Sequence, residues 1–147
     1  MGRVGIGFGV TVGLITAALI ANAAFELFLA VALALAGLVH LLPVTGALSA
    51  RRLHALYGAN ADDAVVLLLL RHRALLFGVL GVAFIASAFV PSWRIGASAV
   101  ALFCMLSFVV LARGAPAARS IGRIVKIDLA LSALLGLALL LRLFVAG

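Results

Sequence analysis

The sequence predicts an all-α fold: an integral membrane bundle of four antiparallel helices, with a further apolar helix extending from the N-terminus. Hydrophobic residues make up 67% of the 147 residues and charged residues only 10%. This composition leaves too little polar side-chain surface to cover a soluble domain. The apolar blocks are also long enough to cross a lipid core of about 30 Å. Short arginine clusters separate the blocks, as is typical of the ends of spanning helices.

The first apolar block is too long for a single span. It covers residues 4–42, and its only strong interruptions are Asn22 and Glu26. One helix of this length would be nearly twice as long as a bilayer core requires. We therefore expect a division near residues 21–26. It separates an apolar N-terminal helix, residues 1–23, from a four-span membrane bundle, residues 24–147, whose first span covers about 24–43.

Residues 1–23 fit two interpretations. Arg3, an apolar core and the sequence Ala21-Asn22-Ala23 have the layout of a secretory signal with an A-x-A cleavage site. Glycines at positions 5, 9 and 13 instead form a small-residue ridge, which lets another helix approach closely. We expect an uncleaved helical extension, either peripheral or an extra span, with a cleaved signal as the alternative.

The remaining spans are expected at about 64–90, 95–112 and 127–145. Asp62 and Asp63 are the expected N-caps of the second span, and a tight turn at residues 91–94 ends it at Pro91. Eight of the eleven basic residues lie in the loops 44–63 and 113–126 or at the adjoining helix starts. They are Arg51, Arg52, Arg71, Arg73, Arg113, Arg119, Arg123 and Lys126. The positive-inside rule therefore places these two loops in the cytoplasm.

Charged residues inside spans are expensive, so each is a candidate for function or for helix locking. At the outward end, antiparallel packing brings Glu26 of the first span and Arg142 of the fourth to a similar depth. The sequence predicts an ion pair between them. The alternative is that Arg142 extends to lipid headgroups while Glu26 lies in water.

A second group of polar residues is expected at the cytoplasmic end. It consists of His40, Arg71, His72, Arg73 and Asp128. Successive helical residues point about 100° apart, so only one or two of residues 71–73 face the bundle. One interpretation is a topology anchor with a single helix-locking Arg–Asp128 pair. The other is a site between the helices for an anion or a headgroup.

We expect no metal, no cofactor and no catalytic residue. His40 and His72 lie at matched depth, as two haem ligands would, but His54 is in a loop and no HExxH or acidic metal spacing is present. The single cysteine, Cys104, excludes an internal disulfide. The basic residues lack interleaved aromatic residues, so nucleic acid is not an expected partner.

Three segments within residues 38–90 carry a family resemblance: 38–43 (LVHLLP), 56–58 (LYG) and 67–78 (LLLLRHRALLFG). They resemble a group of small, uncharacterised bacterial four-helix inner-membrane proteins. The resemblance implies a bacterial inner (plasma) membrane location and the four-span architecture, and it supplies no activity. Some members are named phosphopantetheine adenylyltransferase. That soluble α/β enzyme carries an HxGH motif, which is absent here, so the sequence argues against this activity.

The expected function is non-catalytic: binding of a lipid or another hydrophobic ligand, or service as a partner subunit. Membrane lipids are the expected partners, together with a second copy of the chain or another membrane protein. A small transporter or exporter that works as an oligomer is the first alternative. A membrane redox or haem-binding subunit that uses His40 and His72 is the second.

Overall fold

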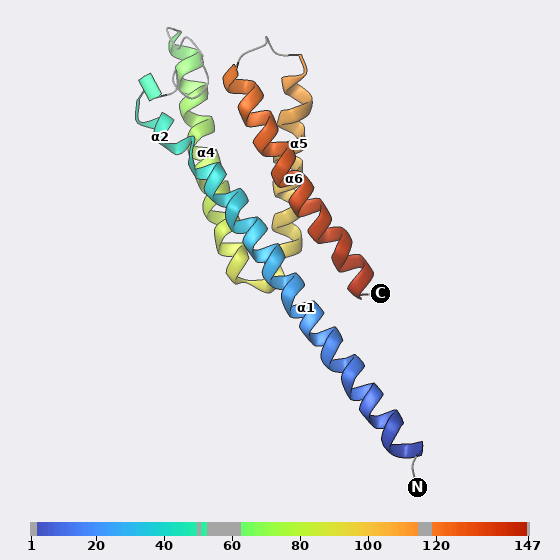
Figure 1. Cartoon of the computed structure of the whole chain (residues 1–147). Coiled ribbons are helices and arrows are strands. Elements are labelled where there is room, and N and C mark those ends of the chain that lie inside the picture. The colour runs from blue at the N-terminus through green and yellow to red at the C-terminus, as the bar shows by residue number, and fades with distance from the viewer. Residues whose placement is uncertain (1–2, 50, 53–62, 115–118, 147) are drawn as a thin grey trace.

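A computed structural model describes residues 3–49, 51–52, 63–114 and 119–146 (Figure 1). It contains four long helices, α1 (Arg3–Leu41), α4 (Ala64–Phe89), α5 (Arg94–Ala112) and α6 (Arg119–Ala146). A short helix α2 (Val44–Ala47) follows α1, and a 3₁₀ turn η1 (Pro91–Trp93) joins α4 to α5. Four segments are long and apolar enough to cross a membrane: Thr11–Ala47, Ala64–Phe89, Pro91–Ala112 and Arg119–Arg142. The described residues contain no strand, so they hold no nucleotide-binding α/β sheet.

The four long helices form the predicted all-α bundle. Helix α1 packs most extensively on α4 and also on α6, and α6 packs on α5. The core is apolar and rich in alanine, so the helices can approach closely. Its buried members are Phe25, Leu29, Ala32, Leu33, Ala36, Phe84, Ala88, Ala101, Met105, Leu131, Leu135 and Ala138. We name the two ends of the bundle the Glu26 end and the His40 end, after residues of α1.

Helix α1 does not break where a division was expected. It continues through residues 21–26, because this segment contains neither glycine nor proline and its alanines and glutamate favour helix. At 1.5 Å per residue, the helix is about 58 Å long. Of the residues from 11 onward, whose exposure the structure describes, 11–24 are exposed and Phe25 is the first that is buried. Within this part of α1, packing begins next to the expected boundary at residue 23. Figure 1 shows the N-terminal half of α1 extending beyond the bundle.

Local chemistry sets the ends of α4. The Asp63 side chain accepts hydrogen bonds from the amides of Val65 (2.7 Å) and Val66 (3.3 Å), which caps the helix as predicted. Asp62 lies outside the described residues. At the other end Val90 is extended, since a residue before proline disfavours helical geometry. Pro91 then opens η1, and the bounds of α4 and α5 agree closely with the predicted spans.

Helix α6 begins earlier than the sequence predicted. It starts at Arg119, so the expectation of a loop over 113–126 is wrong for residues 119–126. The basic residues there made the segment look like a loop, but helix propensity is high for arginine and lysine. The early start places Arg119, Arg123 and Ile127 at four-residue intervals, on one face of the helix.

A close approach of α1 and α4 positions the His40 end. A Cβ atom at Gly37 would lie 2.7 Å from the carbonyl oxygen of Gly81, and one at Gly81 would lie 2.8 Å from that of Gly37. Any larger side chain would therefore force the helices apart. Because these glycines are present, His40, one turn beyond Gly37, packs directly against aromatic residues of α4.

Candidate functional site

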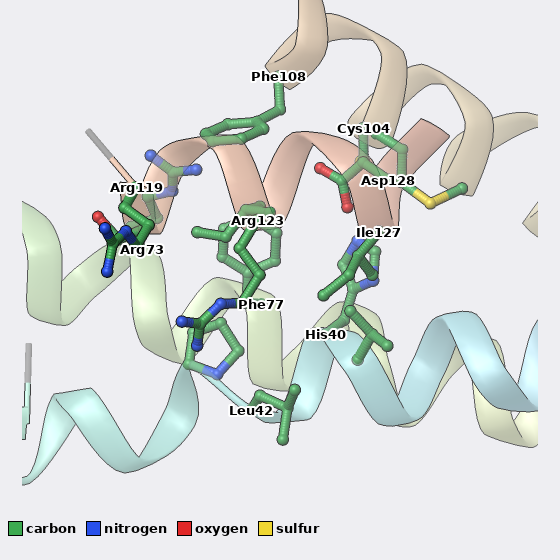
Figure 2. A pocket seen from close by; sticks show the side chains of 15 residues that line it. His40, Leu42, Arg73, Phe77, Cys104, Phe108, Arg119, Arg123, Ile127 and Asp128 are labelled. Carbon is green, nitrogen blue, oxygen red and sulfur yellow. The ribbon is translucent and has the colours of Figure 1, made fainter. Parts of the chain in front are cut away.

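A cavity of about 330 Å³ lies at the His40 end, and we name it the arginine cavity (Figure 2). All four long helices and the link after α1 contribute to its walls. The lining residues are Val39, His40, Leu42, Pro43, Arg73, Phe77, Cys104, Met105, Phe108, Arg119, Ser120, Arg123, Ile124, Ile127 and Asp128. Three charged arginines thus meet a largely apolar wall. Its volume lies within the range of small-molecule pockets.

Of the three adjacent residues Arg71, His72 and Arg73, only Arg73 reaches the cavity. Arg71 and His72 are exposed on the outside of α4 and do not line it. The Arg73 guanidinium lies over the rings of Phe77, at 5.1 Å from the centroid, and Phe108, at 5.3 Å. These cation–π contacts join α4 to α5 and fix the charge at the cavity wall.

His40 is buried, with 4% of its surface exposed. Its Nδ1 lies 2.8 Å from the carbonyl oxygen of Ala36. A carbonyl only accepts, so Nδ1 carries the proton that makes this bond. The ring also packs edge-on against Phe84 and at a tilt against Phe77, with centroids 5.1 Å and 5.3 Å apart. His40 is therefore held rigidly in one orientation.

Asp128 is the carboxylate of the cavity, and it is also buried. Figure 2 shows Arg73, Arg119 and Arg123 toward one side of the hollow and Asp128 toward the other. The charge of Arg73 acts on Asp128 across this space. A direct Arg–Asp128 pair is not among the ion pairs seen in the described part of the chain, since both of those are made by Glu26.

Arg119 and Arg123 are cavity residues that the sequence reasoning missed. Both are exposed at the rim and project from the first turns of α6. They were assigned to a loop because the helix start was placed too late. The signal that could have found them is the four-residue interval of Arg119, Arg123 and Ile127, which ends next to Asp128 and marks a helix face.

The two-histidine arrangement needed for a haem site is not formed. His40 points into the bundle core, whereas His72 is exposed on the outer side of α4, so the two imidazoles do not face a common space. His54 lies outside the described residues. The described part of the chain also contains no cluster of three or more histidine, cysteine or acidic side chains able to hold a metal ion.

At the opposite end of the bundle, Glu26 is bound by two arginines. Its Oε1 accepts from Arg142 and its Oε2 accepts from Arg94 at 2.7 Å. Arg94 also donates to the carbonyl oxygen of Ala88 at 2.8 Å. The sequence reasoning had placed Glu26 beside Arg142 but had assigned Arg94 to a turn. One carboxylate thus links α1, α5 and α6 and, through Arg94, the end of α4.

The charges of the arginine cavity determine what it can bind. Among the described lining residues, three arginines stand against one carboxylate, which is an excess of two positive charges when Asp128 is ionised and His40 is neutral. Arginine donors suit carboxylate and phosphate oxygens, while the apolar walls suit a hydrophobic body. Comparison of the chain with protein-family models, with curated proteins and with solved structures finds no match.

Proposed function

We propose that the protein is a non-catalytic membrane protein that binds a lipid or another hydrophobic molecule bearing negative charge. The observation that supports this function is the convergence of Arg73, Arg119 and Arg123 on one cavity with apolar walls. Ionisable residues within membrane spans are costly and usually serve a ligand or a charge partner. Arg73 lies well inside α4, about 14 Å along the helix from its first residue.

The proposed location is the inner membrane of a bacterium, with residues 44–63 and 113–126, the latter including the first turns of α6, in the cytoplasm. The density of basic residues at the His40 end supports this orientation, and the resemblance of residues 38–90 to small bacterial membrane proteins supports the location. The ligand would then enter from the cytoplasmic leaflet. A fluorescent protein inserted within residues 44–63 should fluoresce, because it stays in the cytoplasm. The same protein fused after residue 147 should not fluoresce, because it would be exported.

Mass spectrometry of the molecules that co-purify with the protein tests the proposed function. We expect a defined set of anionic lipids or hydrophobic acids with the wild-type protein, reduced several-fold in Arg73→Gln. Arg71→Gln is the matched control, because Arg71 has the same charge and helix but is exposed outside the cavity. Equal losses from the two variants would show that charge at the membrane surface, and not the cavity, retains these molecules, and would refute the proposal.

A partner-subunit role is the second candidate, and one observation favours it. Residues 11–24 of α1 extend beyond the bundle (Figure 1) and are exposed, and small residues at four-residue spacing, Gly13, Ala17 and Ala21, would let a partner helix approach closely. Cross-linking from Thr11 or Thr16 in native membranes should capture a partner protein. Cross-links to lipid alone would count against this role.

A further inference from the structure

Arg73 stands at the border between two hollows. One is the arginine cavity. The other, which we name the α4–α5 groove, has a volume of about 590 Å³. Arg73, Phe77, Cys104 and Phe108 line both. The two hollows are therefore adjacent, and these four side chains stand between them.

The groove is apolar and runs between two helices that make few contacts. Helices α4 and α5 contact each other much less than α1 contacts α4, and Figure 1 shows them joined at η1 and separated toward the His40 end. Leu76, Leu80 and Leu111 are among the side chains along the groove. Leu80 lies about 10 Å along α4 from Arg73. This distance offers an alkyl chain a continuous apolar surface.

The surroundings of Arg73 suit it to hold the charged end of such a ligand. Phe77 and Phe108 stack on the guanidinium, and stacking uses its faces while its five N–H donors lie in the plane. Several partners can share these donors. Arg119 and Arg123 add two further guanidinium groups at the exposed rim of the same cavity.

We infer that the ligand is a single-chain amphiphile with a phosphate monoester head. The head lies among Arg73, Arg119 and Arg123, and the alkyl chain lies in the α4–α5 groove. This inference rests on the proposed function and makes its ligand specific. The excess of two positive charges in the cavity is matched by a phosphate monoester, which carries about −1.5 to −2 at neutral pH. A carboxylate would leave half of that excess uncompensated.

The chain carries its own reporter for this inference. Cys104 is its single cysteine, is half-buried and lines both hollows. The rate of its alkylation by N-ethylmaleimide, followed by intact mass spectrometry in maltoside micelles, measures whether the hollows are filled. We expect dodecyl phosphate at ten times its Kd to slow alkylation about tenfold, because only about a tenth of the sites stay empty. Inorganic phosphate and dodecyltrimethylammonium should give little protection.

Two pairs of variants separate the head from the chain. Arg73→Gln should weaken protection by dodecyl phosphate roughly tenfold or more, as expected for loss of a charged hydrogen-bond donor, while Arg71→Gln should not. Ser107→Phe places a ring in the groove, since Ser107 lines only that hollow, and should also weaken protection. Val110→Phe is its control, because Val110 is exposed on the same helix and lines neither hollow.

The possible results distinguish this inference from the proposed function. If Arg73→Gln and Ser107→Phe each weaken protection by dodecyl phosphate, the result supports this inference and the proposed function. If Arg73→Gln weakens protection but Ser107→Phe does not, the placement of the alkyl chain is overturned and an anion site remains. Protection by inorganic phosphate equal to that by dodecyl phosphate has the same meaning. Equal protection by dodecyltrimethylammonium overturns the phosphate head. Absence of protection by any probe, in the wild-type protein as in Arg73→Gln, overturns the inference and also counts against the proposed function.

Discussion

Replacement of Glu26 by glutamine should destabilise the bundle by about 2–3 kcal/mol. The side chains of Arg94 and Glu26 are only 12% and 22% exposed, and Arg94 Nη1 lies 2.7 Å from Glu26 Oε2. Breaking a buried pair by removing one partner costs about 3–5 kcal/mol, whereas an exposed pair contributes about 0–1 kcal/mol. The intermediate burial of this pair, and the hydrogen bonds that glutamine can still accept, place the cost between these values.

The same geometry predicts a ranking among the three partners. Arg142→Gln should cost less than about 1 kcal/mol, because the Arg142 side chain is 35% exposed. Arg94→Gln should cost at least as much as Glu26→Gln, since it also removes the bonds to the Ala88 carbonyl. The double variant Glu26→Gln/Arg94→Gln should cost less than the sum of the two single changes, because both remove the same pair.

Unfolding in mixed micelles with an increasing fraction of dodecyl sulfate measures these costs. Trp93 is the only tryptophan and directly precedes Arg94, so its emission reports on this end of the bundle, and circular dichroism reports on the helices. Arg71→Gln is the control for loss of a charged side chain at an exposed site. A cost for Glu26→Gln no larger than that of the control, or a larger cost for Arg142→Gln than for Arg94→Gln, would refute the reasoning.

Three further predictions use the same unfolding assay. Gly37→Ala should destabilise the bundle by about 1–3 kcal/mol, because its Cβ would lie 2.7 Å from the Gly81 carbonyl oxygen. Gly136→Ala, which meets nothing within 4 Å, should be neutral or stabilise α6 by up to about 1 kcal/mol, and equal destabilisation by the two changes would contradict the close-approach argument. Asp63→Ala should destabilise the bundle by about 1 kcal/mol through loss of the N-cap. It should also speed hydrogen exchange of the amides in the first turn of α4, and unchanged exchange would show that the cap does not stabilise this turn. Removal of residues 1–23 should change stability by less than about 0.5 kcal/mol, since residues 11–24 are exposed, and a larger loss would mean that this segment packs in the micelle.

The parts of the fold that local chemistry determines could be predicted from the sequence. The bounds of α4 follow from the Asp63 cap and from Pro91, and apolar blocks of spanning length identify the helices. The break in α1 and the start of α6 were wrong for a shared reason. Both predictions used bilayer length or polarity to place a helix end, whereas a helix continues until its backbone meets a breaker.

The candidate site was predictable only in part, because it depends on helix rotation and on register between helices. Successive helical residues point about 100° apart, so residues 71–73 cannot all face inward. The hydrophobic pattern of α4 does not show which of them does, because this helix is apolar on most sides. The role of Arg94 needs the register between α1 and α5, which are distant in the sequence. Glu26 and Arg142 were easier to place together, since Glu26 lies near the start of the first predicted span, Arg142 lies near the end of the fourth, and these two spans run antiparallel.

The two ends of the bundle differ in how their arginines are neutralised, and this difference determines where a ligand can act. At the Glu26 end one carboxylate contacts two arginines, and the bond from Arg94 to the Ala88 carbonyl joins the α4 terminus to the same network. At the His40 end one buried carboxylate, Asp128, shares a hollow with three arginines. An anion adds little at the first end, because carboxylate and carbonyl oxygens already occupy its donors. At the second end an anion adds negative charge beside three arginines and one carboxylate, so its binding energy is gained at the wall that α4 and α5 share.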